Sequence, residues 1–172
     1  MAFGGTASYH QTTHLWKPNP NGPRTIAEAR QIAENNGAYI EDDLHFISVP
    51  DEQYAKQFGD SYASFGQVDF QSGTQIVPWR APNATTDAIA NHTGKINVWV
   101  RQSVLGSDKA ITAVLSHESF EIEALREIFQ KNGGALPVIT YKDLVRPGSA
   151  DNPHWQAVDH GDELVRKMSN QR

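Results

Sequence analysis

Hydrophobic and polar positions alternate with two different periods along this chain, which predicts both strands and helices. The clearest strand is Lys95–Arg101, where Ile96, Val98 and Val100 alternate with polar or aromatic residues. Successive side chains of a strand point to opposite faces, so one face of this segment should be buried. Shorter runs predict further strands at Ala38–Ile40, Leu44–Val49, Gln67–Phe70, Ile76–Trp79 and Leu136–Tyr141.

Capping signals predict four helices. Thr25 and Glu28 form a capping-box pattern, and Gly37 stands where the first helix should end. Ser107 is a suitable N-cap for the longest helix, and prolines open the other two. The helices are expected between Thr25 and Gly37, from Pro50 to Phe58, from Asp108 to Lys131, and from Pro153 to about Met168.

The order of these elements predicts one α+β domain over residues 25–172, with an N-terminal helix, a small mixed sheet, a long helix and a C-terminal helix. Residues 1–24 are rich in Gly, Ser, Thr, Asn and Pro, which is typical of an irregular segment. We interpret them as an arm, either a linker remnant of a larger polypeptide or an ordinary frayed terminus.

Charge and cysteine content narrow the classes of function. The formal net charge is −5, whereas proteins that bind mainly phosphates are usually basic, so no nucleic-acid partner is expected. No apolar run approaches the roughly 18 residues of a membrane-spanning helix, and the N-terminus lacks the basic and apolar regions of a signal peptide. Cysteine is absent, so a protein-bound metal would have to use His, Asp or Glu.

The long helix carries the chemically informative residues. His117, Glu118 and Glu121 fall on a side that is otherwise apolar. An ionised carboxylate in an apolar setting costs several kcal/mol unless it is paired or bound to a metal. The opposite side is polar and is expected to face solvent; it consists of Lys109, Thr112, Ser116, Ser119, Glu123, Glu127 and Lys131.

A divalent metal would stabilise these three groups together. His117 and Glu121 are four residues apart, so both can reach one ion from the same face of a helix. Glu118 would then lie beside water bound to that ion, where a general base belongs. The alternative is a buried polar network without metal, in which Arg80 or Arg101 neutralises the carboxylates.

The segment Ile111–Glu121 resembles the active-site helix of the zincin metallopeptidases, whose motif is H-E-x-x-H. The resemblance implies a zinc ion held by His117, Glu118 as general base, and hydrolysis of a peptide or amide bond in a protein or peptide substrate. This chain has Glu121 in place of the second histidine, giving H-E-x-x-E, and a carboxylate also binds zinc. In zincins an edge strand precedes this helix and binds substrate, which here implies Val98, Trp99 and Val100.

In one zincin branch a downstream helix supplies the third ligand, and here that helix would begin at Pro153. Its apolar stripe, extended back by one turn, reaches His154. His160 flanks the same stripe and is the second choice, with Asp159 and Asp162 as groups that orient a ligand histidine. Tyr141 is a candidate oxyanion donor.

The layout is also similar to zincin-like domains of bacterial polymorphic toxins. That resemblance implies a secreted effector domain of a larger polypeptide, blocked by a cognate immunity protein. Two other classes stay open. One is a metal-independent ribonuclease toxin, in which His117 works with Glu118 or Glu121, and Arg101 or Lys142 holds phosphate. The other is a catalytically silent binding module that holds no metal.

Overall fold

The computed structural model describes residues 17–60, 62–64, 67–70, 75–78, 96–131 and 153–170. Within these residues the chain is α+β, as the sequence predicts. Its helices are α2 (Ile26–Asn35), α3 (Asp51–Phe58), α5 (Asp108–Lys131) and α7 (Pro153–Asn170), with the 3-10 helix η2 (Gln102–Gly106) directly before α5. Its strands are β1 (Leu44–Val49), β2 (Ala63–Ser64), β3 (Gln67–Phe70), β4 (Gln75–Pro78) and β5 (Ile96–Arg101).

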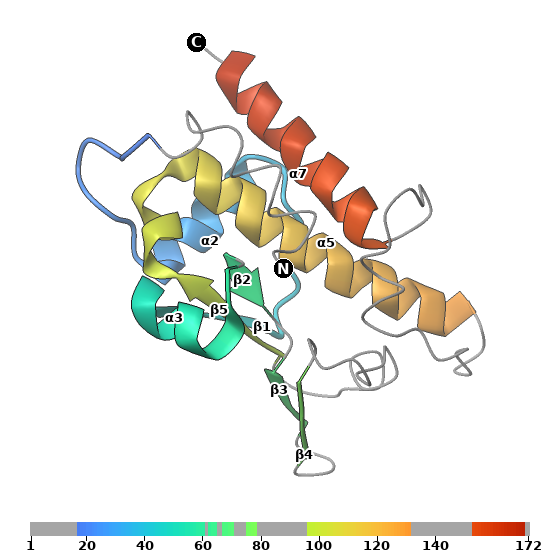
Figure 1. Cartoon of the computed structure of the whole chain (residues 1–172). Coiled ribbons are helices and arrows are strands. Elements are labelled where there is room, and N and C mark those ends of the chain that lie inside the picture. Colours follow the sequence, from blue (N-terminus) through green and yellow to red (C-terminus); the bar gives the residue numbers. More distant parts are fainter. Residues whose placement is uncertain are drawn as a thin grey trace.

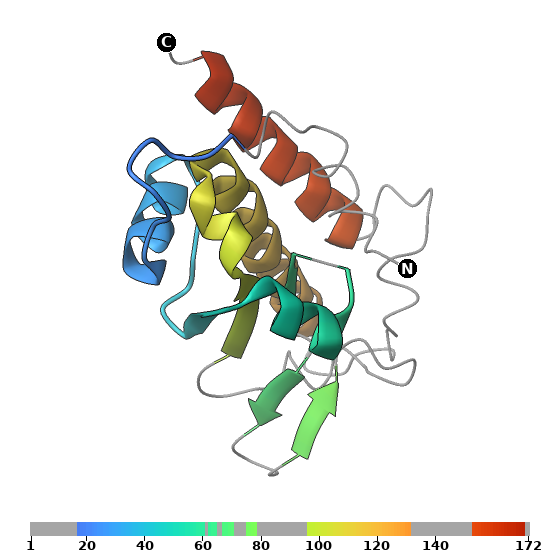
Figure 2. The ribbon, with the colours of Figure 1, turned by 60° about the vertical axis from the view of Figure 1, so that its left-hand side comes forward.

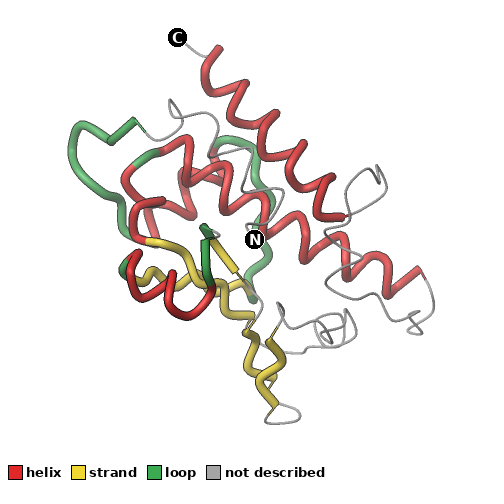
Figure 3. Tube along the Cα trace, in the orientation of Figure 1, coloured by secondary structure: helices red, strands yellow, loops and turns green. Residues whose placement is uncertain are grey.

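The main sheet has the strand order β1-β5-β2. β1 pairs with β5 in parallel over six residues, from Leu44 opposite Ile96 to Val49 opposite Arg101. β2 pairs with the other side of β5 in the antiparallel direction, so the sheet is mixed, as expected. The prediction that β5 is an edge strand is wrong, because strands flank it on both sides. β3 and β4 form a separate antiparallel ribbon that extends away from the helices (Figure 3).

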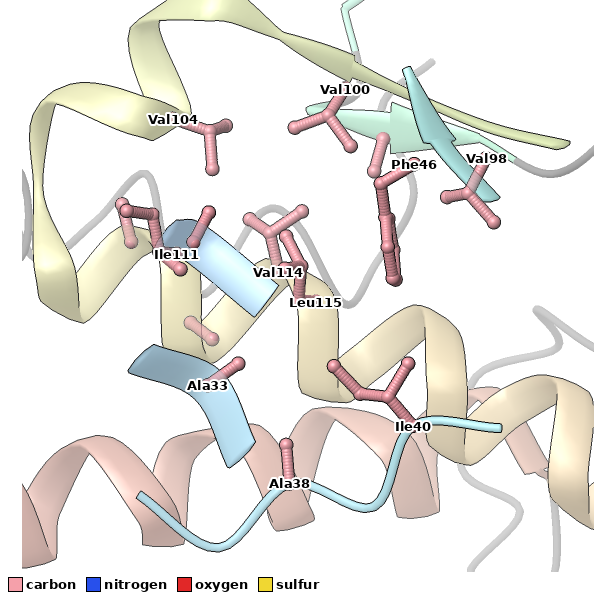
Figure 4. Packing of buried hydrophobic residues seen from close by; sticks show 14 of the residues in the cluster. Ala33, Ala38, Ile40, Phe46, Val98, Val100, Val104, Ile111, Val114 and Leu115 are labelled. Atoms are coloured by element: carbon pink, nitrogen blue, oxygen red, sulfur yellow. The ribbon is translucent and has the colours of Figure 1, made fainter. Parts of the chain in front are cut away.

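The core lies between the main sheet and α5. Val98 and Val100 of β5 and Phe46 of β1 point toward Val114 and Leu115 of α5 (Figure 4). These five side chains are at most 3 % exposed, and the alternation predicted for β5 places both valines on the buried face. On the other face of the sheet, the ring of Trp99 packs against that of Phe58 on α3. The sheet therefore separates α3 from α5.

Helix α5 is covered on several sides. α7 runs beside it in the opposite direction, α2 packs against it, and the sheet covers a third side (Figures 1 and 2). Thr112, Ser116 and Ser119 are consequently buried, and the prediction that they face solvent is wrong. Ser116 Oγ donates to the carbonyl of Ala113 at 3.2 Å, and Ser119 Oγ donates to that of Leu115 at 2.7 Å. Small hydroxyl residues that bond to their own helix can be buried without a partner from elsewhere.

Helix α2 begins and ends as its sequence indicates. Thr25 Oγ1 accepts from the backbone N–H of Glu28, and Glu28 Oε1 accepts from the N–H of Thr25, both at 3.1 Å. Gly37 follows the helix with φ of 104°, a left-handed conformation that favours glycine. A Cβ at Gly37 would also lie 3.0 Å from Cδ2 of Leu164, so the end of α2 is pressed against α7.

Residues 38–40 do not form the predicted strand. The guanidinium of Arg30, on α2, donates to the carbonyls of Ile40, Glu41 and Leu44 at 3.3, 2.8 and 2.8 Å. The side chain of Arg30 thus binds the carbonyls of Ile40 and Glu41, which the N–H groups of a neighbouring strand would otherwise bind. Apolar Ala38 and Ile40 are buried, which explains why the segment resembles a strand in sequence.

Residues 17–24 are irregular, but they are held against the start of α5. Asn19 N donates to the carbonyl of Gly106 at 2.7 Å, and Asn19 Oδ1 accepts from the N–H of Asp108 at 3.1 Å. Both carboxylate oxygens of Asp108 accept from the guanidinium of Arg24 at 3.0 Å. The last part of the expected arm therefore packs on the domain. No helix within the described ranges is long and apolar enough to cross a membrane.

Candidate metal centre

One turn of α5 and the first turn of α7 bring together three of the predicted ligands. His117 and Glu121 are separated by four residues on α5, and His154 is the second residue of α7. Each offers one ligand atom, and these three atoms lie within 4.8 Å of one another. The structure therefore assembles His117, Glu121 and His154 into one group that could hold a metal ion.

A single carboxylate oxygen joins the two imidazoles. Glu121 Oε2 is 2.9 Å from His117 Nε2 and 3.1 Å from His154 Nδ1. The two rings have centroids 4.9 Å apart and are inclined at 76°. Both rings thus present a nitrogen to the same oxygen from nearly perpendicular planes, so their ligand atoms converge on a small volume.

Burial controls the electrostatics of this group. His117 and Glu121 are 2 % exposed and His154 is 0 % exposed. Burial lowers the pKa of His117 below its usual value, although the hydrogen bond to Glu121 opposes this. Burial raises the pKa of Glu121, but His154 and His117 together outweigh it and lower that pKa to about 2. A neutral imidazole and an ionised carboxylate are the forms that bind metal.

The position of His154 follows from how α7 packs. Pro153 occupies the first helical position, which puts His154 in the first turn. The buried face of α7 continues through Ala157, Val158, Leu164 and Val165. This stripe is the one predicted from the sequence, and its burial directs His154 toward α5.

Glu118 lies next to the group but does not belong to it. It is 5 % exposed, on α5 immediately after His117. Successive helical residues are rotated by about 100°, so Glu118 and His117 leave the helix in different directions. Glu118 is not one of the three residues whose ligand atoms converge.

The second choice for the third ligand is placed elsewhere. His160 is not among the converging residues of the described chain. Its ring stacks on that of Phe120, with centroids 5.0 Å apart and an interplanar angle of 28°. Burial lowers its pKa, and Glu163 partly opposes this. Asp159 and Asp162 are exposed to solvent, so their placement does not support a role in orienting a buried histidine.

The predicted substrate residues lie in and on the sheet. Val98 and Val100 are 0 % exposed, so their side chains fill the core rather than a substrate cleft. Trp99 is half-buried on the opposite face, where its ring lies 5.7 Å from that of Phe58. The sequence signal was ambiguous, because alternation identifies a buried strand but not its place in the sheet.

The guanidinium of Arg101 contacts α3 and the residue that follows it. Its guanidinium donates to the carbonyls of Asp51 and Gly59 at 3.2 and 2.8 Å, and it lies 5.0 Å from the centroid of the Tyr54 ring. These contacts hold α3 to the end of β5, which leaves the guanidinium poorly placed to hold a phosphate at the His117 group. Arg80, Tyr141 and Lys142, the other residues named for these roles, lie outside the described residues.

A further residue of the centre is missed by the sequence pattern. Trp155 follows His154 in α7, and its ring lies 5.4 Å from that of His154 at 77°. The sequence suggests only that Trp155 builds or covers the core. Its adjacency to a candidate ligand is the one signal that points to the site.

Comparison with protein-family models, with curated protein sequences and with solved structures finds no match to this chain.

Proposed function

We propose that this protein is a metal-dependent hydrolase with a zincin-like active-site helix, which cleaves a peptide or amide bond. The observation that carries the proposal is the convergence of His117, Glu121 and His154 at a buried position. Placing two imidazoles and a carboxylate together out of water has a cost that a bound cation would offset.

The donor set suits zinc. Ligand atoms about 2.1 Å from a tetrahedral zinc lie about 3.4 Å from one another. The distances of Glu121 Oε2 to His117 Nε2 and His154 Nδ1, 2.9 and 3.1 Å, are close to that spacing. Three protein ligands, with a fourth position for water, are typical of catalytic zinc sites, whereas structural sites use four protein ligands.

The departure from the H-E-x-x-H motif is balanced by the third ligand. Glu121 replaces an imidazole by a carboxylate, and His154 returns an imidazole from α7. The complete set is two histidines and one glutamate, a combination found in catalytic zinc sites. The charge of the full ligand set is then the same as when the motif's second His and a downstream Glu are the ligands.

In the proposed reaction a bound divalent metal supplies a Lewis acid that lowers the pKa of water and polarises the scissile carbonyl. Glu118 accepts a proton from water at a carboxylate oxygen and passes it to the leaving nitrogen. His117, Glu121 and His154 keep their positions through the helix packing described above. The neighbouring position of Glu118 on α5, outside the ligand group, supports this division of roles.

The test uses zinc-loaded protein and a fluorogenic peptide library. We expect hydrolysis that EDTA abolishes and added zinc restores. Glu118→Gln should retain the metal and lose at least about 100-fold in rate, since general-base catalysis contributes about 10²–10⁴-fold. Glu127→Gln is the matched control, because Glu127 is exposed on the same helix. Full activity of Glu118→Gln would refute the mechanism.

We also propose that the domain is the effector part of a larger secreted toxin, with an immunity protein as partner; the similarity of its layout to zincin-like toxin domains supports this. A growth assay tests it. Expression of the wild type inside bacterial cells should arrest growth, and Glu118→Gln should not.

A further inference from the structure

The ring of His154 contacts two other aromatic rings. Its centroid is 4.9 Å from that of His117 at 76°, and 5.4 Å from that of Trp155 at 77°. His117 belongs to the ligand group, whereas Trp155 does not. The indole is half-buried, at the first turn of α7.

A ligand imidazole needs a fixed ring orientation. The torsion that rotates a histidine ring is broad and weakly restrained by itself. Here the ring must keep Nδ1 toward Glu121 Oε2, at 3.1 Å. The surroundings of a ligand histidine usually fix its orientation, and changing them typically costs 10- to 100-fold in metal affinity. Near-perpendicular packing of these two rings against His154 restricts its rotation in the same way.

We propose that Trp155 is a positioning residue, whose indole ring fixes the orientation of His154 for metal binding. The inference rests on the proposed metal centre. Trp155 acts through His154 and contacts neither substrate nor metal in this proposal. A perpendicular aromatic contact is the property that matters, so another aromatic ring should replace it and a flexible apolar chain should not.

The test compares Trp155→Phe with Trp155→Met and uses Co²⁺ as the probe. Met is unbranched and flexible, so it fills the space without supplying a ring. Affinity is measured against a competing chelator, and the visible absorption of bound Co²⁺ reports the coordination geometry. We expect Trp155→Met to bind Co²⁺ about 10-fold more weakly with altered absorption bands. Trp155→Phe should remain within about 3-fold of the wild type, with its spectrum.

Trp99→Met is the matched control, because Trp99 is also half-buried and packs on an aromatic ring, 5.7 Å from Phe58. It should bind Co²⁺ as the wild type does. Wild-type affinity and spectrum in Trp155→Met would overturn the inference, and so would equal weakening in Trp99→Met. Failure of the wild type to bind Co²⁺ or Zn²⁺ would instead refute the metal centre.

A second readout uses the wild-type protein, should Trp155→Met fail to fold. The indole N–H resonance of Trp155 is identified by its loss in Trp155→Phe. Zinc should shift this resonance more than that of Trp99. An unshifted Trp155 resonance in zinc-bound protein would overturn the inference.

Discussion

Glu121 and His154 are separated by 33 residues in the sequence, yet Oε2 of the first lies 3.1 Å from Nδ1 of the second. This buried contact joins α5 to α7. His117 contacts the same oxygen at 2.9 Å, so one carboxylate oxygen contacts imidazoles on two helices. The contact between Glu121 and His154 therefore makes the candidate metal centre depend on the packing of α7 against α5.

Removing Glu121 should destabilise the metal-free protein. Glu121→Ala removes the acceptor that the buried imidazoles of His117 and His154 share, and losing a buried hydrogen-bond partner typically costs about 1–3 kcal/mol in the free energy of unfolding. Glu127→Ala on the exposed side of α5 should change it by less than about 0.5 kcal/mol. Urea denaturation in EDTA measures both. Equal values for the two variants would show that the Glu121 contacts add no stability.

Zinc should stabilise the folded protein through His154 and not through His160. Zinc at 100 times its Kd adds about 2.7 kcal/mol, because it binds the folded state. His154→Ala should lose most of this gain, since it removes one of the three converging ligands. His160→Ala should keep the gain, because His160 packs on Phe120 outside the ligand group. Thermal unfolding with and without zinc measures the effect; loss of the gain in His160→Ala would reassign the third ligand.

Gly37 should resist substitution. Alanine there would meet Cδ2 of Leu164 at 3.0 Å and would have to adopt a φ of 104°. We expect Gly37→Ala to lower the free energy of unfolding by about 2 kcal/mol, mostly through strain. Gly106→Ala is the control, because no atom lies within 4 Å of its added Cβ. Chemical denaturation compares them, and a Gly37→Ala protein as stable as Gly106→Ala would contradict the left-handed conformation of Gly37 and its close contact with Leu164.

Arg101 should hold α3 in place. Arg101→Met removes the donors to the carbonyls of Asp51 and Gly59 and the contact with Tyr54. The expected loss is about 1 kcal/mol, the scale of a hydrogen bond whose acceptor water can still reach, because the bond to Gly59 is exposed and that to Asp51 is partly buried. Lys56→Met, at an exposed position of α3, is the control. Hydrogen exchange should quicken across α3 in Arg101→Met only; unchanged protection would show that α3 is held by its apolar contacts.

The sequence predicts local elements well where capping and period agree. Thr25 and Glu28 fix the start of α2, α5 begins directly after Ser107, and α7 begins at Pro153. It fails at residues 38–40, where the guanidinium of Arg30 binds the carbonyl of Ile40 and that of Glu41 just after the segment. No local pattern reveals a side chain that arrives from another element.

Helical spacing also predicts the candidate site. It places His117 and Glu121 on an apolar side of α5, where burying them is costly, and it extends the apolar stripe of α7 to His154. The place of β5 inside the sheet depends on β2, a two-residue strand with almost no sequence signal. The burial of Ser116 was also missed, because a hydroxyl counts as polar in any periodicity although it can donate to a carbonyl of its own helix.

Metal content tests the central claim most directly. Purified protein, incubated with zinc at neutral pH and passed through a desalting column, is measured by elemental analysis beside His117→Ala. The metal centre predicts about one zinc per chain in the wild type and almost none in the variant, because three converging ligands are reduced to two. A wild-type protein without zinc would contradict the account and would make His117, Glu121 and His154 a metal-free polar network; RNA cleavage in EDTA would then be assayed next.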